Sequence, residues 1–205
     1  MIKLHHLNQS RSKRIIWLLE ELKVDYEIVP YVRDEVTFLA PPELKSVHPL
    51  GKSPVLEDDG EIIIESGAIT EYLIEKYAQD SLSPKRGTKA YTQYLQWLHF
   101  AESSAILPML LKLFVSKEPT TTQFLSGYAD KEAMSVLSYF EHMLEGKNYL
   151  VEERLTGADI MMSFIVELVQ KFGMTSHFPN IGRYGQQLST HSAFVHAEQI
   201  EAKYA

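Results

Sequence analysis

Segments with the spacing of β-strands occur only before residue 65 of this 205-residue chain, and every long segment after residue 87 has helical spacing. Strands are expected over residues 2–6, 26–30, 54–57 and 61–64. Helices are expected over 11–22 and 66–77, with one short helix in the irregular stretch 32–47, which Pro41-Pro42 interrupts. The chain therefore begins with a mixed α/β region and continues as a purely helical one.

Two local patterns support the α/β region. The first helix carries apolar residues at i, i+3, i+4 and i+7, and Ser10 is a natural N-cap for it. Those apolar residues are Ile15, Leu18, Leu19 and Leu22. The last two strands flank Asp59-Gly60, a dipeptide typical of tight hairpin turns. The resulting order βαβαββα predicts a thioredoxin-like domain, which we place at residues 1–79.

The helical half follows a linker predicted at Gln79–Gly87, where Ser, Pro and Gly gather. Long helices are expected over 91–117, interrupted at Pro108, and over 122–145 and 157–172. Two shorter ones are expected over 180–188 and 192–201. We therefore predict an α/β N-terminal domain followed by an all-α domain at residues 88–205.

Composition narrows the functional classes. Acids outnumber bases by 27 to 20 and the net charge is −7, which argues against nucleic acid as a partner. The absence of cysteine excludes disulfides, cysteine zinc sites, C-x-x-C redox pairs and a cysteine nucleophile. The N-terminus lacks the apolar core of a signal peptide, and no uncharged apolar stretch approaches the roughly 18 residues of a spanning helix. We expect a cytoplasmic protein without a membrane partner.

No metal site is expected either. His5 and His6 are adjacent on a predicted strand, so their side chains point to opposite faces and cannot chelate one ion together. The other histidines are scattered, and none has the spacing of a known ligand pair.

The segment Gly51–Glu57 is typical of a peptide-binding edge. Ser53-Pro54 is an X-Pro bond, the common place for a cis peptide. Pro54 has no N–H to donate, so a strand starting there is expected to leave the main chain of Val55 unpaired, where an extended peptide adds. Further on, Glu65-Ser66 opens a helix whose free N–H groups attract a carboxylate. Together these features predict a site for a small acidic peptide.

These motifs resemble a known family. The order of Gly51, Pro54-Val55-Leu56 and Glu65-Ser66-Gly67-Ala68-Ile69 resembles the glutathione-binding segment of the glutathione S-transferase superfamily. The run Leu7–Arg14 is similar to the serine-type enzymes of its bacterial and fungal branch. The likeness covers essentially the whole chain. It implies transfer of glutathione, a co-substrate rather than a permanently bound cofactor, to a small hydrophobic electrophile, glutathione-dependent peroxide reduction as a further activity, and a homodimer.

Ser10 is our first candidate for activating the glutathione thiol. A free thiol has a pKa of about 8.5, and a hydroxyl proton at a helix N-terminus favours the thiolate. The family's serine precedes a helix arginine by four positions, as Ser10 precedes Arg14. Ser12 is the second candidate and Asn8 a minor one; the plainer interpretation is that Ser10 only caps the helix. A tyrosine mechanism is not expected, because no tyrosine stands at residues 5–7.

Two groups of residues are expected to hold glutathione. Near the turn are His48, Lys52, Ser53, Pro54 and Val55, of which His48 and Lys52 could reach the glycine carboxylate. The alternative is an exposed loop lysine and a turn histidine. At the helix start, the resemblance assigns Ser66 to the γ-glutamyl carboxylate and Glu65 to the ammonium end. Glu65 could instead be an ordinary acid at a strand end.

The electrophile is expected to lie against the first long helix. Candidates are Phe100, Ser103, Ser104, Leu107 and Met109, and ordinary core packing is an equal alternative for them. Thr156 and Asp159 form a T-x-x-D capping box, which we interpret as structural. The alternative to an enzyme is a non-catalytic glutathione-binding or regulatory protein on the same fold. An isomerase of the maleylacetoacetate type would need a serine-cysteine signature, which this chain lacks.

Overall fold

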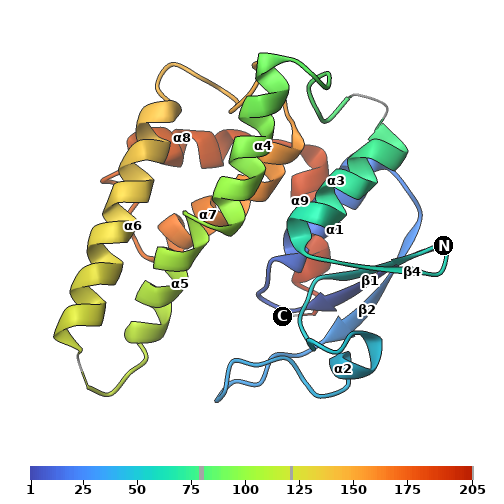
Figure 1. Cartoon of the computed structure of the whole chain (residues 1–205), viewed down its shortest axis with the longest axis horizontal. Coiled ribbons are helices and arrows are strands. Elements are labelled where there is room, and N and C mark those ends of the chain that lie inside the picture. Colours follow the sequence, from blue (N-terminus) through green and yellow to red (C-terminus); the bar gives the residue numbers. More distant parts are fainter. Residues whose placement is uncertain (79–80, 121, 205) are drawn as a thin grey trace. The chain divides into compact units, whose positions relative to one another are not determined.

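The computed structural model describes residues 1–78, 81–120 and 122–204 and divides into two compact units (Figure 1). The first comprises Met1–Leu82 together with the segment that begins at Ser189, and the second comprises Ser83–Leu188. This differs from the expected division, in which 88–205 formed one helical domain. The cause is α9 (Ser192–Glu201), which packs on α1 (Ser12–Leu22) of the first unit.

The first unit is built on a four-stranded mixed sheet with the order β2-β1-β3-β4. Its strands are β1 (Ile2–Leu7), β2 (Tyr26–Tyr31), β3 (Val55–Asp58) and β4 (Glu61–Ile64). β1 and β2 are parallel, whereas β3 is antiparallel to both of its neighbours. The short helix α2 (Leu44–Val47) lies between β2 and β3 in the chain. The expected order βαβαββα is confirmed, since α3 (Ser66–Leu73) and a π-helical turn at Ile74–Ala78 complete the unit.

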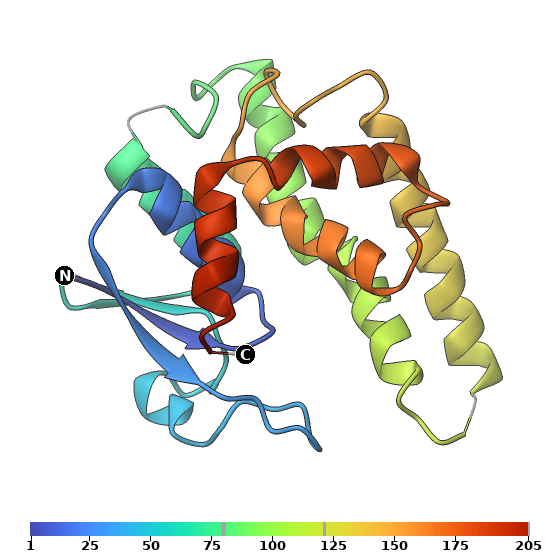
Figure 2. The ribbon, with the colours of Figure 1, turned by 180° about the vertical axis from the view of Figure 1, so that it is seen from behind.

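Helices α1, α3 and α9 form one layer (Figures 1 and 2), in which α1 packs on β1, α3 and α9. The predicted apolar face of α1 is buried, with Ile15, Leu18 and Leu19 inaccessible to solvent. The aromatic ring of Trp17 meets that of Phe194 edge to face, at 5.0 Å between centroids. These contacts explain why the segment from Ser189 folds with the first unit.

The described residues of the second unit form helices joined by turns and loops. Its helices are α4 (Lys89–Glu102), α5 (Ile106–Val115), α6 (Gln123–Met143), α7 (Gly157–Lys171) and α8 (Pro179–Leu188). The break expected at Pro108 is wrong: the chain leaves the helix at 103–105, and Pro108 lies in the first turn of α5. A proline is tolerated there because the first N–H groups of a helix have no partner within it. Of the predicted linker, residues 79–80 lie outside the described part, while Leu82 and Pro84 are buried.

The predicted capping box opens α7. The carboxylate of Asp159 accepts hydrogen bonds from the main chain and hydroxyl of Thr156, at 2.8 and 2.9 Å, and from the hydroxyl of Tyr184 at 2.8 Å. Burial raises the pKa of Asp159 more than these bonds lower it. The residue is fully buried. With a further hydrogen bond from the N–H of Leu150 at 3.0 Å, it ties the start of α7 to α8 and to the loop before α7, as its structural interpretation requires.

Lys89–Val115 is the one stretch in the described residues that is long and apolar enough to cross a membrane by composition, with a mean hydropathy of 1.4. It covers α4 and α5, which are separate helices, and they pack on α7 and α6 respectively.

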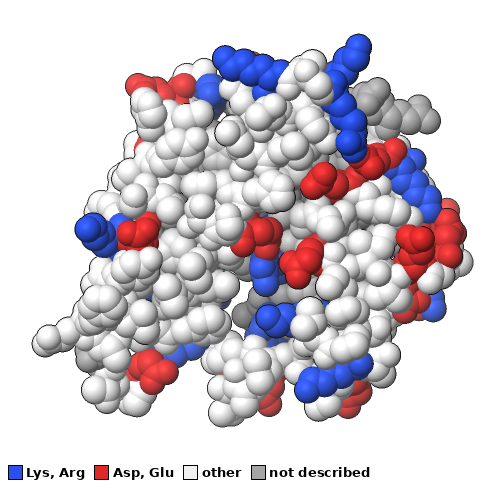
Figure 3. Space-filling model, viewed as in Figure 1, with Lys and Arg blue, Asp and Glu red and all other residues white. Residues whose placement is uncertain are grey.

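On the surface drawn in Figure 3, acidic and basic side chains are interspersed between uncharged ones.

Candidate functional site

The candidate residues of the first unit meet at one end of its sheet. Because β3 runs antiparallel to β1 and β4, the end of β1, the start of β3 and the end of β4 lie together. The register puts Val55 opposite His5 on one side and opposite Ile64 on the other. The segments 8–12, 51–54 and 65–66 therefore leave the sheet at this same end.

Leu7, the last residue of β1, links two of these segments. The hydroxyl of Ser53 donates to the carbonyl of His5 at 2.8 Å and accepts the N–H of Leu7 at 3.1 Å. The carbonyl of Leu7 in turn accepts the hydroxyl of Ser12 at 3.2 Å. The turn before β3 and the start of α1 are thus fixed on the two polar groups of one residue.

The Ser53-Pro54 bond is cis, but the expected unpaired edge at Val55 is wrong. β3 is an interior strand, and Val55 pairs with β4 because the tight turn after Asp58 folds β4 back onto it. Pro54 is buried and has no N–H. Within the described residues, the main-chain N–H and C=O of Ser53 make no hydrogen bond. The open main chain therefore lies before the proline, at Ser53.

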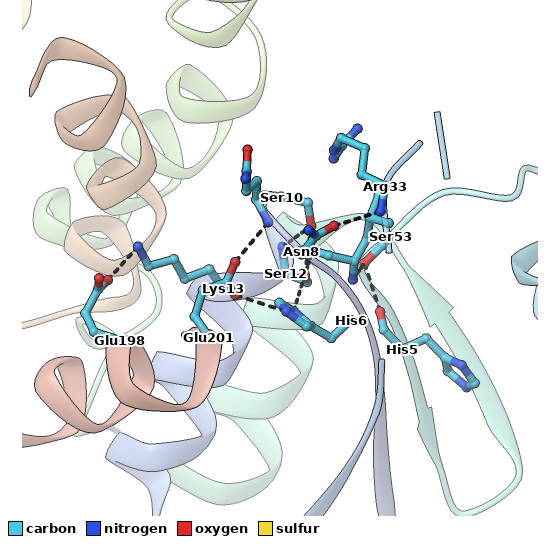
Figure 4. A network of polar contacts seen from close by, with 12 residues as sticks. His5, His6, Asn8, Ser10, Ser12, Lys13, Arg33, Ser53, Glu198 and Glu201 are labelled. Carbon is cyan, nitrogen blue, oxygen red and sulfur yellow. Dashed lines mark hydrogen bonds and ion pairs between the residues drawn. The ribbon is translucent and has the colours of Figure 1, made fainter. Parts of the chain in front are cut away.

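Ser10 and Ser12 are buried at the start of α1 (Figure 4). The Ser10 hydroxyl oxygen accepts the N–H of Ser12 at 3.2 Å, and the two hydroxyl oxygens are 2.8 Å apart. The helix begins at Ser12, so Ser10 satisfies one of its free N–H groups from two residues before it. The N-cap position is Arg11, so Ser10 is not the expected N-cap, although its hydroxyl still accepts an N–H of the first turn and remains available to the site.

Asn8 makes hydrogen bonds to the chain after β2 rather than to the serines. Its side-chain carbonyl accepts the N–H of Arg33 at 2.8 Å, and its own N–H donates to the carbonyl of Tyr31 at 3.2 Å. These bonds tie the end of β1 to the chain that follows β2. The amide oxygen of Asn8 is consequently engaged in holding the loop.

The start of α3 contains a buried hydroxyl without a partner. Ser66 is 3% exposed, and its Oγ makes no hydrogen bond to any described residue. Such a group costs free energy unless something binds it. Glu65 before it is exposed and has a φ of 67°, in the region that L-residues seldom adopt. The helix start thus presents an unsatisfied donor beside the free N–H groups of α3.

His48 and Lys52 lie on the approach to β3. His48 follows α2, and its Nδ1 accepts the N–H of Leu50 at 3.4 Å. Lys52 is exposed next to Ser53. Their roles toward a glycine carboxylate stay predictions.

The electrophile candidates all belong to the second unit. Phe100 packs its ring against those of Trp97 and Tyr139, at 5.4 and 5.5 Å between centroids. Ser103 donates its hydroxyl to the carbonyl of His99 at 2.7 Å. Ser104 and Leu107 are exposed, whereas Met109 is fully buried in the core. Ser103, Ser104 and Leu107 are thus accessible to a substrate, whereas Met109 belongs to the core.

Two residues at the site were not predicted from the sequence. Nδ1 of His6 lies 2.7 Å from the hydroxyl of Ser12, and its Nε2 forms an ion-pair contact of 3.0 Å with Glu201 of α9. Glu201 also accepts the N–H of Gln9 at 2.9 Å, across 192 positions of sequence. Nothing in the local sequence around Glu201 signals this contact.

Among the described residues, no group of three or more His, Asp or Glu side chains is arranged for a metal ion.

A four-stranded mixed sheet with this helix order, joined to an all-helical unit, defines a thioredoxin-like domain with a helical partner domain. Family models for the N-terminal and C-terminal domains of glutathione S-transferase match residues 1–75 and 104–191. Glutathione S-transferase 3 of Schizosaccharomyces pombe is 37% identical, over 98% of this chain and 88% of its own. The chain belongs to the glutathione S-transferase family.

Solved structures agree with this assignment. The crystal structure of a glutathione S-transferase from Actinobacillus pleuropneumoniae is 39% identical, with a TM-score of 0.90 over 98% of this chain and 93% of its own. A glutathione transferase from Phanerochaete chrysosporium, solved in complex with oxidized glutathione, is 25% identical with a TM-score of 0.86 and covers 100% of this chain and 97% of its own.

Proposed function

We propose that the protein binds glutathione at the sheet end described above and activates its thiol with Ser10. The observation that carries the proposal is the buried, unpartnered hydroxyl of Ser66 at the start of α3. A carboxylate accepts hydrogen bonds and is favoured at a helix N-terminus, so it would satisfy both the hydroxyl and the free N–H groups. The γ-glutamyl carboxylate of glutathione meets this need, and Glu65 is suited to its ammonium group.

The main chain of glutathione would then run past Ser53. Its free N–H and C=O can pair with an extended peptide, which replaces the role first expected of Val55. Pro54 and Val55 would shape the wall behind it, while Lys52 and His48 would lie toward the glycine carboxylate. Ser66 and Ser53 fix the two halves of the tripeptide, and the cysteine between them faces the start of α1.

At that position, the hydroxyl of Ser10 would donate to the sulfur. The pKa of the thiol, about 8.5 when free, would fall because the hydroxyl and the helix N-terminus both favour the anion. The thiol proton leaves to solvent, and the sulfur forms a bond to an electrophilic carbon as the leaving group departs with its electron pair. Orientation of the bound sulfur supplies much of the rate.

The substrate range is a further part of the proposal. An apolar electrophile suits a family whose helical domain contributes the second site, for which Phe100, Ser103, Ser104 and Leu107 are the candidates. Glutathione-dependent reduction of a peroxide is the related activity. We also expect a homodimer, from the family resemblance, and a cytoplasmic location, from the lack of a signal-peptide pattern. In this assignment the first unit binds glutathione and Ser83–Leu188, the second unit, contributes the electrophile site.

The test is a comparison of Ser10→Ala, Ser66→Ala and the wild type by glutathione calorimetry and turnover on halogenated aromatics and peroxides. Ser10→Ala should lose turnover while keeping affinity, and Ser66→Ala should lose affinity. Ser116→Ala, an exposed serine of the helical unit, is the matched control. Absence of glutathione binding by the wild type contradicts the proposal, whereas binding without turnover favours the non-catalytic alternative. Unchanged turnover in Ser10→Ala alone would move the role to Ser12 or Asn8.

A further inference from the structure

A continuous polar chain leads from the last turn of α9 to Ser10, as Figure 4 shows. It runs from Glu201 to His6 at 3.0 Å, from His6 to Ser12 at 2.7 Å, and from Ser12 to Ser10 at 2.8 Å. All four residues are buried, and His6 and Ser12 are inaccessible to solvent. No part of the proposed chemistry so far uses His6 or Glu201.

The direction of the hydrogen bonds along this chain decides what Ser10 can do. If Nδ1 of His6 carries no proton, the Ser12 hydroxyl donates to it, and the Ser12 oxygen is then open to the proton of Ser10. The Ser10 hydroxyl would point inward. If Nδ1 is protonated, it donates to Ser12, which then donates to Ser10 or to the carbonyl of Leu7. The proton of Ser10 is then free to point out of the protein.

Glu201 favours the second arrangement. A carboxylate 3.0 Å from Nε2 attracts positive charge onto the ring, which favours a proton on both ring nitrogens. Burial by itself raises the pKa of Glu201, but contact with His6, the N–H of Gln9 and the charge of Lys13 outweigh it and hold the pKa below its ordinary value. The carboxylate is therefore the charged partner that the imidazolium requires.

We propose that His6 and Glu201 are positioning residues that orient the Ser12–Ser10 hydroxyl pair outward, so that Ser10 can donate to a bound sulfur. This inference rests on the proposed function. The helix α9, far along the chain, would then control the direction in which the Ser10 hydroxyl points, without touching the substrate.

Further groups lie close to this pair. The ring of Tyr204 lies 5.8 Å from that of His6, between centroids, and Lys13 pairs with Glu198 at 2.5 Å one turn before Glu201. Gln9 contributes its main-chain N–H. Glu198 is therefore a matched control, because it lies on the same helix and pairs with α1 but does not contact His6.

The first experiment compares Glu201→Gln and Glu198→Gln with the wild type. In Glu201→Gln, the apparent pKa of the bound thiol, followed by thiolate absorbance, should rise by about one unit, and kcat below that pKa should fall about tenfold. The KM for glutathione should change by less than about twofold, since the binding groups are untouched. Glu198→Gln should match the wild type in all three quantities.

If the wild type is active and Glu201→Gln has the same thiol pKa and kcat, this inference is overturned and the proposed function is left intact. A wild type that neither binds nor turns over glutathione instead removes the proposed function, and the inference with it. An equal loss of kcat in Glu198→Gln also overturns the inference, because it would show a general effect of loosening α9.

The second experiment reads the protonation of His6 directly in the wild type. Nitrogen-15 NMR of the histidine side chains in the wild type should show His6 with a proton on Nδ1 at neutral pH, and the signal is assigned by its loss in His6→Asn. A neutral His6 with a bare Nδ1 at neutral pH overturns the proposal.

Discussion

The starts of α1 and α3 stand at the same end of one sheet, yet their polar groups are in opposite states. At α1, Ser10 and Ser12 are buried in a chain of contacts that reaches His6 and Glu201. At α3, the equally buried Ser66 hydroxyl has no partner among the described residues. A hydroxyl that is hydrogen-bonded, as those of Ser10 and Ser12 are, is held in one orientation, whereas an unsatisfied hydroxyl gains most when a ligand arrives. The first helix start is thus suited to orienting a reacting atom and the second to binding.

The strongest test of this comparison is Ser10→Ala. It removes the donor aimed at the sulfur, so we expect kcat to fall about 100-fold, in the range seen when one donor to a developing anion is lost. Affinity for glutathione, measured by calorimetry, should stay within about twofold. A comparable loss of affinity would show that the two helix starts do not divide orientation and binding between them.

A change at the other end of β3 tests whether the effects are local. Asp58 accepts hydrogen bonds from Lys76 at 2.7 Å, Tyr77 at 2.9 Å and Tyr72 at 3.0 Å. Asp58→Asn should lower the free energy of unfolding by about 2 kcal/mol, because hydrogen bonds to a buried charge are lost. Chemical denaturation measures this. Glutathione affinity of the folded variant should be unchanged, and a large drop would contradict the separation of the two sheet ends.

The same variant has a predicted pH dependence. Burial raises the pKa of Asp58, but the bonds from Lys76, Tyr77 and Tyr72 outweigh it and leave the pKa below its ordinary value. The stabilisation is therefore fully present above the unfolded pKa of about 4 and is lost as pH falls through the folded pKa. Wild type should lose more stability than Asp58→Asn over this acid range. Parallel curves of unfolding free energy against pH would contradict this assignment.

Ser66→Ala should act on binding and on stability in opposite directions. Loss of the hydroxyl should weaken glutathione about tenfold, the usual scale of one hydrogen bond to a charged group. Without ligand, the variant should be slightly more stable than wild type, because a buried unpartnered hydroxyl is removed. Calorimetry and thermal unfolding report the two effects. Lower stability without ligand would mean that the hydroxyl already has a partner.

The smallest expected effect is that of Glu65→Gly. Glycine adopts the φ of 67° without strain, so the free protein should gain about 1 kcal/mol in unfolding free energy while glutathione binds more weakly. Glu153→Gly is the matched control, since Glu153 is also exposed and has a φ of 48°. It should gain stability and keep its affinity. Equal affinities in both variants would remove Glu65 from the site.

Local patterns in the sequence predicted several elements of both units. The apolar spacing of α1, the Asp59-Gly60 hairpin and the capping box of Asp159 all appear in the structure, because each depends on residues within one turn or one hairpin. The register of β3 was not accessible in this way. Its partners come from both directions along the chain, and they place Val55 inside the sheet.

The remaining differences are also long-range. Glu201 reaches Gln9 across 192 positions, and no periodicity of α9 indicates that contact. A proline inside a helical pattern normally predicts a break. Pro108, however, lies in the first turn of α5, where its missing N–H costs no hydrogen bond of the helix. The hydroxyl of Ser66 was predicted as a binding group from a motif, but only the three-dimensional packing shows that it is buried and unpartnered.

The placement of α9 has a consequence for biosynthesis. The sheet and α1 leave the ribosome first, but Trp17 meets Phe194 only after the whole helical unit between them has been made. Domains that fold in order of synthesis normally complete the N-terminal one early. Here one side of α1 stays uncovered until α9 has been synthesised, so the first unit completes its folding only after the second has been made.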